Sequence, residues 1–127
     1  DGVAALAEES DYLVLSCPGG PETRRMIDAE VMRALGPEGF LINVARGSIV
    51  DNEALVSALK DGVIAGAAID VYEDEPNIPD AFKSLDNLTL TPHIGGNASD
   101  ATHAKYLCFM ENMRAHMTGK PLPTPLG

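Results

Sequence analysis

Three ionisable side chains, Arg46, Asp70 and His93, each stand at the end of a short apolar segment of the chain. Such segments are typical of buried strands, and an open parallel sheet binds its ligands at the carboxyl ends of its strands. Histidine titrates near neutral pH, so His93 can give or take a proton during a reaction. Arg46 can hold a carboxylate through two parallel N–H bonds. An acid and a carboxylate clamp suit the reduction of a 2-oxo acid, provided that a cofactor supplies hydride.

The acidic run Glu73-Asp74-Glu75 offers a carboxylate partner to His93. A carboxylate bonded to one ring nitrogen favours the imidazolium form, fixes the tautomer and directs the other nitrogen toward a substrate. On this reasoning alone, the three carboxylates are equivalent candidates. The run could also be a solvated loop, although Pro76 after it favours a fixed bend.

Taken one at a time, these residues also have structural explanations. An Arg before Gly is usually a turn residue, an Asp after a strand is usually a cap, and a single His is more often structural than catalytic. The purely structural interpretation weakens because the predicted sheet brings all three to one edge. Other candidates are weaker still: Cys17 is expected to pack in an apolar segment, and His103 and His116 belong to a predicted helix.

Apolar runs and amphipathic stretches alternate along the chain, which indicates strands separated by helices. The predicted strands are residues 12–17, 40–45, 63–71 and 88–91. The predicted helices are residues 29–35, the stretch between Asp51 and Lys60, and a final helix from Ser99 or Asp100 to about Thr118. An acidic loop is expected from Glu73 to about Asn87, and an extended tail from Pro121 to Gly127.

Local signals fix the ends of two of these helices. Asp28 and Asp51 are expected N-caps, and Gly36 and Gly62 are expected to follow the last turns. Strands that alternate with helices form βαβ units, so the predicted fold class is α/β with a parallel sheet. The strands read as continuous apolar runs, which is typical of a doubly wound sheet covered on both faces.

Composition narrows the range of functions. The chain has 127 residues, 45% of them hydrophobic and 22% charged, which indicates one folded domain at most. Its net charge of −10 opposes nucleic acid as a partner. No apolar run approaches the roughly 18 residues of a membrane span, and no segment resembles a signal peptide. Two distant cysteines suggest neither a disulfide framework nor a metal site. A cytoplasmic protein is expected.

The segment from Leu41 to Gly96 resembles the D-isomer-specific 2-hydroxyacid dehydrogenases. The resemblance is carried by ARG, DVYEDEP and PHIGG in this order and spacing, and weaker similarity extends over almost the whole chain. SCPGGPET and LGPEGFLINVARG are most similar to the branch of glyoxylate/hydroxypyruvate reductases and plant hydroxyphenylpyruvate reductases. The resemblance implies an oxidoreductase that reduces a small 2-oxo acid, such as hydroxypyruvate or glyoxylate, with NADP or NAD. NADP is slightly favoured.

The same resemblance implies three catalytic residues. Arg46 binds the carboxylate and carbonyl of the substrate, Glu75 orients the imidazole, and His93 protonates the carbonyl oxygen as hydride arrives. Arg46 and His93 also face the cofactor. The other residues that it implies for cofactor binding are Pro18 and Thr23 at the adenosine and phosphate portion, Val44 and Ala45 at the nicotinamide, Asp70 at its carboxamide, and Gly95 and Gly96 after the histidine.

The resemblance covers only part of such an enzyme. The glycine-rich phosphate loop, the residue that chooses between NAD and NADP, and the substrate domain have no counterpart in these 127 residues. The chain is therefore expected to be the second half of a Rossmann nucleotide-binding domain with the helix after it, from a homodimeric parent protein. Two alternatives remain: a corepressor-like module of the same fold that senses dinucleotide, or a fragment that is inert alone.

Overall fold

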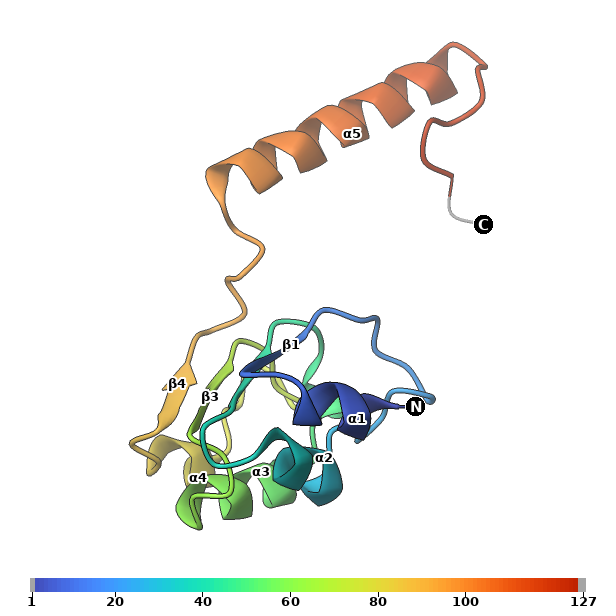
Figure 1. Ribbon diagram of the computed structural model, residues 1–127. Coiled ribbons are helices and arrows are strands. Elements are labelled where there is room, and N and C mark those ends of the chain that lie inside the picture. Colours follow the sequence, from blue (N-terminus) through green and yellow to red (C-terminus); the bar gives the residue numbers. More distant parts are fainter. Residues whose placement is uncertain (1, 126–127) are drawn as a thin grey trace. The chain divides into compact units, whose positions relative to one another are not determined.

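The computed structural model describes residues 2–125, which form two compact units that divide after His93. The first unit contains a four-stranded parallel sheet in the order β1-β2-β3-β4 (Figure 1). Its strands are β1 (Tyr12–Leu15), β2 (Phe40–Asn43), β3 (Gly66–Ile69) and β4 (Leu88–Leu90). Leu15, Asn43 and Ile69 are paired in register, and Ile69 pairs with Leu90. All four strands therefore end at one edge, as the sequence predicts.

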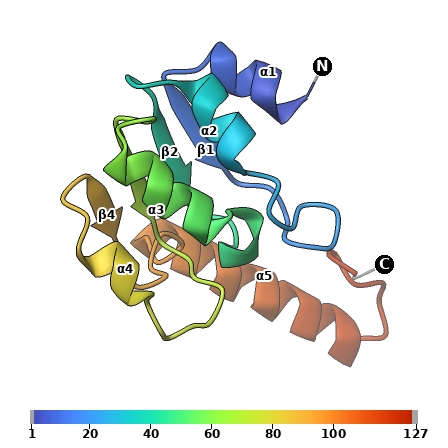
Figure 2. The ribbon, with the colours of Figure 1, turned by 90° about the horizontal axis from the view of Figure 1, so that it is seen from below.

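The helices of this unit lie on one face of the sheet. They are α1 (Val3–Glu8), α2 (Ala29–Leu35), α3 (Asn52–Lys60) and the single turn α4 (Asp80–Lys83), and a short 3₁₀ helix spans Gly47–Ile49. Figure 2 shows α1, α2 and α3 side by side. Consecutive strands are neighbours in the sheet, and because crossovers keep one hand, successive helices fall on the same side. This is the arrangement of one half of a doubly wound α/β fold.

Capping residues set the ends of α2 and α3. One carboxylate oxygen of Asp28 accepts from the N–H groups of Glu30 (2.9 Å) and Val31 (3.1 Å). Asp51 accepts in the same way from Glu53 and Ala54. These contacts satisfy amide groups that a helix start leaves without partners. Beyond the helix ends, Gly36 and Gly62 have φ of 79° and 66°, which glycine adopts without strain. The predicted caps and stops are confirmed.

The core lies between the sheet and this helical layer, with Met32, Leu41, Ile49 and Leu55 almost wholly buried. The opposite face of the sheet differs from expectation within residues 2–93. Tyr12 and Val14 of β1 are 62% and 53% exposed, and the ring of Tyr12 stacks on Phe40 at 5.3 Å between centroids. Within residues 2–93 the helices lie on the other side of the sheet, so no helix of this unit covers Tyr12 and Val14.

Two boundary predictions need correction. The strands end earlier than predicted, so Cys17 lies two residues beyond β1, half-buried and packed against the core. The segment predicted as an acidic loop contains α4, because Phe82 is 2% exposed and anchors that turn in the core. An ion pair between Lys83 Nζ and Asp80 Oδ1 (2.7 Å) supports the same turn.

The second unit is built on the predicted final helix, α5 (Ser99–Met117). The chain after it turns back beside the helix (Figure 1). Asn112 fastens this return: its Nδ2 donates to Thr124 Oγ1 at 2.8 Å, and its Oδ1 accepts from the Thr124 N–H at 3.3 Å. Across residues 2–125, no helix is both long and apolar enough to cross a membrane.

Candidate active site

His93 and Glu75 meet at the carboxyl edge of the sheet. Nδ1 of His93 lies 2.8 Å and 3.0 Å from the two carboxylate oxygens of Glu75. His93 follows β4 and has φ of 55°, a left-handed conformation that is uncommon for residues other than glycine. Because Nδ1 is held by the carboxylate, Nε2 is the nitrogen that can exchange a proton with a substrate.

The structure distinguishes the three carboxylates that the sequence left equivalent. Glu73 accepts from Nη2 of Arg24 at 2.6 Å, and Asp74 accepts from the side chain of Asn77 at 3.2 Å. Glu75 alone of the three contacts the ring of His93. The bond to His93, followed by a bond from the Tyr72 N–H, holds the pKa of the Glu75 carboxyl below its usual range. Glu75 is therefore a charged partner for His93 at neutral pH.

Arg46 stands at the start of the turn that follows β2. Its Nη1 donates to the Ala45 carbonyl at 2.6 Å, and its positive charge contributes to the lowered pKa of Glu75. A Cβ added at Gly19 would lie 2.7 Å from Cγ of Arg46, so Gly19 leaves the space that the arginine stem occupies. Arg46 is an exposed residue, and its guanidinium has further N–H groups that can bind a carboxylate.

Gly47 brings the arginine loop against the loop that carries Glu75. A Cβ at this position would lie 2.1 Å from the carbonyl carbon of Tyr72 and 2.3 Å from the amide nitrogen of Glu73. These are backbone atoms, which cannot move aside as the end of a side chain can. The close approach of the two loops therefore depends on the absence of a side chain at Gly47.

The residues predicted for cofactor binding lie after all four strands and in the second unit. Pro18 accepts through its carbonyl from the Thr23 hydroxyl at 3.0 Å, which closes the loop after β1. Val44 is 46% exposed after β2, whereas Ala45 is buried. Asp70 is buried after β3 and accepts from the Thr91 hydroxyl at 2.5 Å. Gly95 and Gly96 belong to the second unit, and their cofactor role stays a prediction.

These strand ends fit part of a nicotinamide dinucleotide. An exposed apolar side chain at Val44 offers a surface for a flat ring, and the Asp70 carboxylate is an acceptor suited to an amide. Within residues 2–125, no three His, Cys, Asp or Glu side chains gather where they could hold a metal ion.

Sequence reasoning missed two residues that shape the site. The Tyr72 hydroxyl lies 2.8 Å from the Thr91 carbonyl and 3.1 Å from the Ile69 carbonyl, so it joins the ends of β3 and β4. Burial, the largest cause, and the charge of Asp70, the second, raise the pKa of the Tyr72 phenol and keep it neutral.

The second missed residue, Asn43, ends β2 and is 1% exposed. A polar residue inside the apolar run FLINVA was the signal that could have singled it out.

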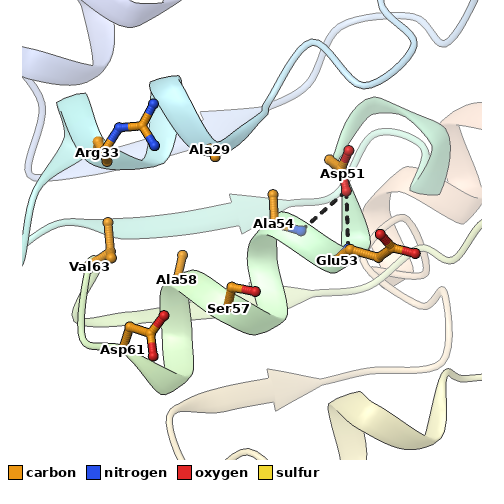
Figure 3. Close-up of a pocket in the computed structure, with 9 residues that line it drawn as sticks. All are labelled: Ala29, Arg33, Asp51, Glu53, Ala54, Ser57, Ala58, Asp61 and Val63. Carbon is orange, nitrogen blue, oxygen red and sulfur yellow. Dashed lines mark hydrogen bonds between the residues drawn. The ribbon is translucent and has the colours of Figure 1, made fainter.

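The pockets of the first unit differ in their relation to this site. A small pocket of about 120 Å³ is lined by His93, Glu75, Tyr72 and three apolar neighbours. A groove of about 390 Å³ lies between α2 and α3 (Figure 3). It contains none of the residues predicted for catalysis or cofactor binding, and Asp51 on its wall is already bonded to the α3 amides. The groove is therefore separate from the candidate chemistry.

Comparison with known proteins identifies the family. Residues 1–95 match the model of the D-isomer specific 2-hydroxyacid dehydrogenase NAD-binding domain. The chain is 45% identical over 124 residues to a hydroxyphenylpyruvate reductase of Plectranthus scutellarioides, and 43% identical over 124 residues to a glyoxylate/hydroxypyruvate reductase of Arabidopsis thaliana. Each match covers 98% of this chain and 40% of the relative.

A solved structure gives the same result. The NADPH-dependent glyoxylate/hydroxypyruvate reductase of Sinorhizobium meliloti, in complex with NADP and malonate, matches with a TM-score of 0.90 and 40% identity. That match covers 99% of this chain and 40% of the reductase chain, so the chain spans about two fifths of the length of these relatives. With a parallel Rossmann-like sheet and a family match over residues 1–95, the chain belongs to the D-isomer specific 2-hydroxyacid dehydrogenases.

Proposed function

We propose that the protein containing this chain reduces a small 2-oxo acid, hydroxypyruvate or glyoxylate, to the corresponding D-2-hydroxy acid. The observation that carries the proposal is the bond between His93 Nδ1 and the Glu75 carboxylate at 2.8 Å, on the same sheet edge as Arg46. This arrangement supplies a proton donor and a carboxylate clamp. Both are needed to reduce a ketone or aldehyde that is next to a carboxylate.

Each residue has a defined part in the proposed reaction. Arg46 binds the substrate carboxylate and orients the carbonyl toward His93. Glu75 stabilises the protonated ring, and Nε2 of His93 gives its proton to the carbonyl oxygen as that oxygen gains negative charge. When bound, the nicotinamide supplies the hydride. In the reverse direction, His93 removes the proton from the hydroxyl group.

The proposal includes the cofactor and the setting. NADP is favoured over NAD because the similar Sinorhizobium enzyme is NADPH-dependent. The proposal takes residues 1–127 as part of the nucleotide-binding domain with the helix after it. We propose a homodimer in the cytoplasm with no nucleic-acid partner, in keeping with a net charge of −10.

The direct test follows the absorbance of reduced nicotinamide. The whole protein is mixed with NADPH, and separately with NADH, together with hydroxypyruvate or glyoxylate. We expect turnover with both acids and a higher kcat/KM with NADPH. Tight NADPH binding without turnover on either acid would contradict the proposal and would favour a dinucleotide-sensing module. A rate that depends on NADH alone would reverse the cofactor assignment.

Changing Glu75 to glutamine is expected to narrow the pH range in which reduction is fast. The carboxyl pKa of Glu75 lies below its usual range, so the group is charged at neutral pH and stabilises the imidazolium of His93. Glutamine keeps an oxygen near Nδ1 but has no charge, so it stabilises the protonated ring less than the Glu75 carboxylate does. The ratio of natural to variant kcat should therefore rise with pH, measured from about pH 6 to about pH 9.

The matched control for this prediction is Asp74→Asn. Asp74 contacts Asn77 rather than His93, so its substitution should leave the shape of the pH profile unchanged. An equal displacement in both variants would mean that the general acidity of the loop, and not the Glu75–His93 bond, sets the profile.

A further inference from the structure

Asn43 is the residue that connects the sheet to the arginine loop. It is the last residue of β2 and lies three residues before Arg46. Its side chain makes two hydrogen bonds, both with that loop: Oδ1 accepts from the Ala45 N–H at 3.0 Å, and Nδ2 donates to the Arg46 carbonyl at 3.0 Å. Its main-chain carbonyl accepts from the Asp70 N–H at 3.0 Å. Asn43 therefore bonds to the backbone of the loop after β2 and to the backbone of Asp70 after β3.

The other backbone bonds on this side of the loop are longer, and one of them runs from the Ile49 N–H to the Arg46 carbonyl at 3.3 Å. Regular pairing of β2 ends at Asn43, and the next ladder-like bond, from the Val44 N–H to the Leu15 carbonyl, is long at 3.4 Å. Arg46 itself is extended, with φ of −146° and ψ of 144°. Its Nη1 bonds to the Ala45 carbonyl within the same loop. Because this contact is internal to the loop, the guanidinium should move with the backbone that Asn43 holds.

We infer that Asn43 is a positioning residue for substrate binding: it holds the backbone of residues 45 and 46 so that the Arg46 guanidinium faces the substrate carboxylate. Asparagine suits this task because its short amide offers one acceptor and one donor side by side. Aspartate has no donor for the Arg46 carbonyl, and glutamine is one methylene longer. The inference deepens the proposed function, on which it rests.

The test is a double-mutant cycle in the whole protein, with Asn43→Ala, Arg46→Ala and both together. We expect Asn43→Ala to raise the KM for glyoxylate at least about tenfold, while the Kd of NADPH changes less than about threefold. In the Arg46→Ala background, the same change should cost less than about a further twofold in kcat/KM, because the arginine through which Asn43 acts is gone. Losses that multiply, or an unchanged KM, would overturn the inference.

Asn87→Ala is the matched control. Its amide also donates to backbone carbonyls, those of Leu59 and Ala65, but it precedes β4 at the opposite edge of the sheet. It should lower thermal stability without raising the KM for glyoxylate. An increase in KM equal to that of Asn43→Ala would show that general loosening of the sheet is responsible.

Two further measurements keep the test decisive. If Asn43→Ala does not fold, the cycle is repeated with Asn43→Asp, which keeps the volume and the acceptor but lacks the donor. If the natural protein binds NADPH but turns over no 2-oxo acid, the proposed function fails. The Kd of oxamate is then measured for the same four proteins of the cycle. If the Asn43 change weakens oxamate binding only when Arg46 is present, the positioning role is still supported. Equal weakening in both backgrounds would reject it.

Discussion

The His93→Ala variant is expected to lose 10²–10⁴-fold in kcat for reduction, the range that a positioned general acid supplies. The physical reason is that alanine cannot hold a proton at the position of Nε2, so the carbonyl oxygen must take its proton from water. The Kd of NADPH should change far less than kcat. Steady-state rates with glyoxylate, together with NADPH binding followed by fluorescence, measure the two effects separately.

The backbone at His93 needs its own control. With φ of 55°, alanine at this position carries a strain of roughly 1–2 kcal/mol, whereas asparagine visits the left-handed region more readily. His93→Asn should therefore fold better than His93→Ala and lose a similar factor in kcat. His103→Ala on α5, which removes an exposed histidine, should retain natural turnover. Near-natural kcat in His93→Asn would refute the proton-donor role.

Gly47→Ala is expected to be the most damaging single-methyl change at the site. The new Cβ would fall 2.1 Å and 2.3 Å from backbone atoms of Tyr72 and Glu73, so one of the two loops must shift. Overpacking a well-filled interior costs about 1–3 kcal/mol or more, and here the shift would also separate Arg46 from Glu75. We expect a destabilisation of at least about 2 kcal/mol in urea unfolding of the whole protein, with kcat/KM reduced beyond the loss of folded enzyme.

Gly20→Ala provides the comparison. Nothing lies within 4 Å of a Cβ added at Gly20, so this variant should unfold within about 0.5 kcal/mol of the natural protein. If Gly47→Ala is as stable and as active as Gly20→Ala, the two loops can accommodate a methyl group at Gly47. That result would refute the claim that their close approach requires glycine.

Local sequence signals were sufficient for much of the fold. Asp28 and Asp51 begin helices and Gly36 and Gly62 follow them, because capping is decided within three or four residues of the chain. The apolar runs located all four strands, because a buried strand is marked by a short run of neighbouring apolar residues. They did not locate α1, α4 or the 3₁₀ helix, since these short elements depend on core contacts such as that of Phe82 more than on periodicity.

For the candidate site too, some features follow from the sequence and others only from the tertiary structure. The sequence by itself determined that Arg46, Asp70 and His93 would share one edge, because parallel strands linked by helices end together. The tertiary structure decided which carboxylate serves His93, since Arg24 and Asn77 engage Glu73 and Asp74. It also decided that Gly47 must lack a side chain and that Asn43 supports the arginine loop. Two of these contacts, Arg24 with Glu73 and Gly47 with Tyr72, join residues that are far apart in the sequence, so spacing along the chain does not specify them. The contacts of Asn43 and Asn77 are local, but they depend on the conformation that each loop adopts in the folded protein.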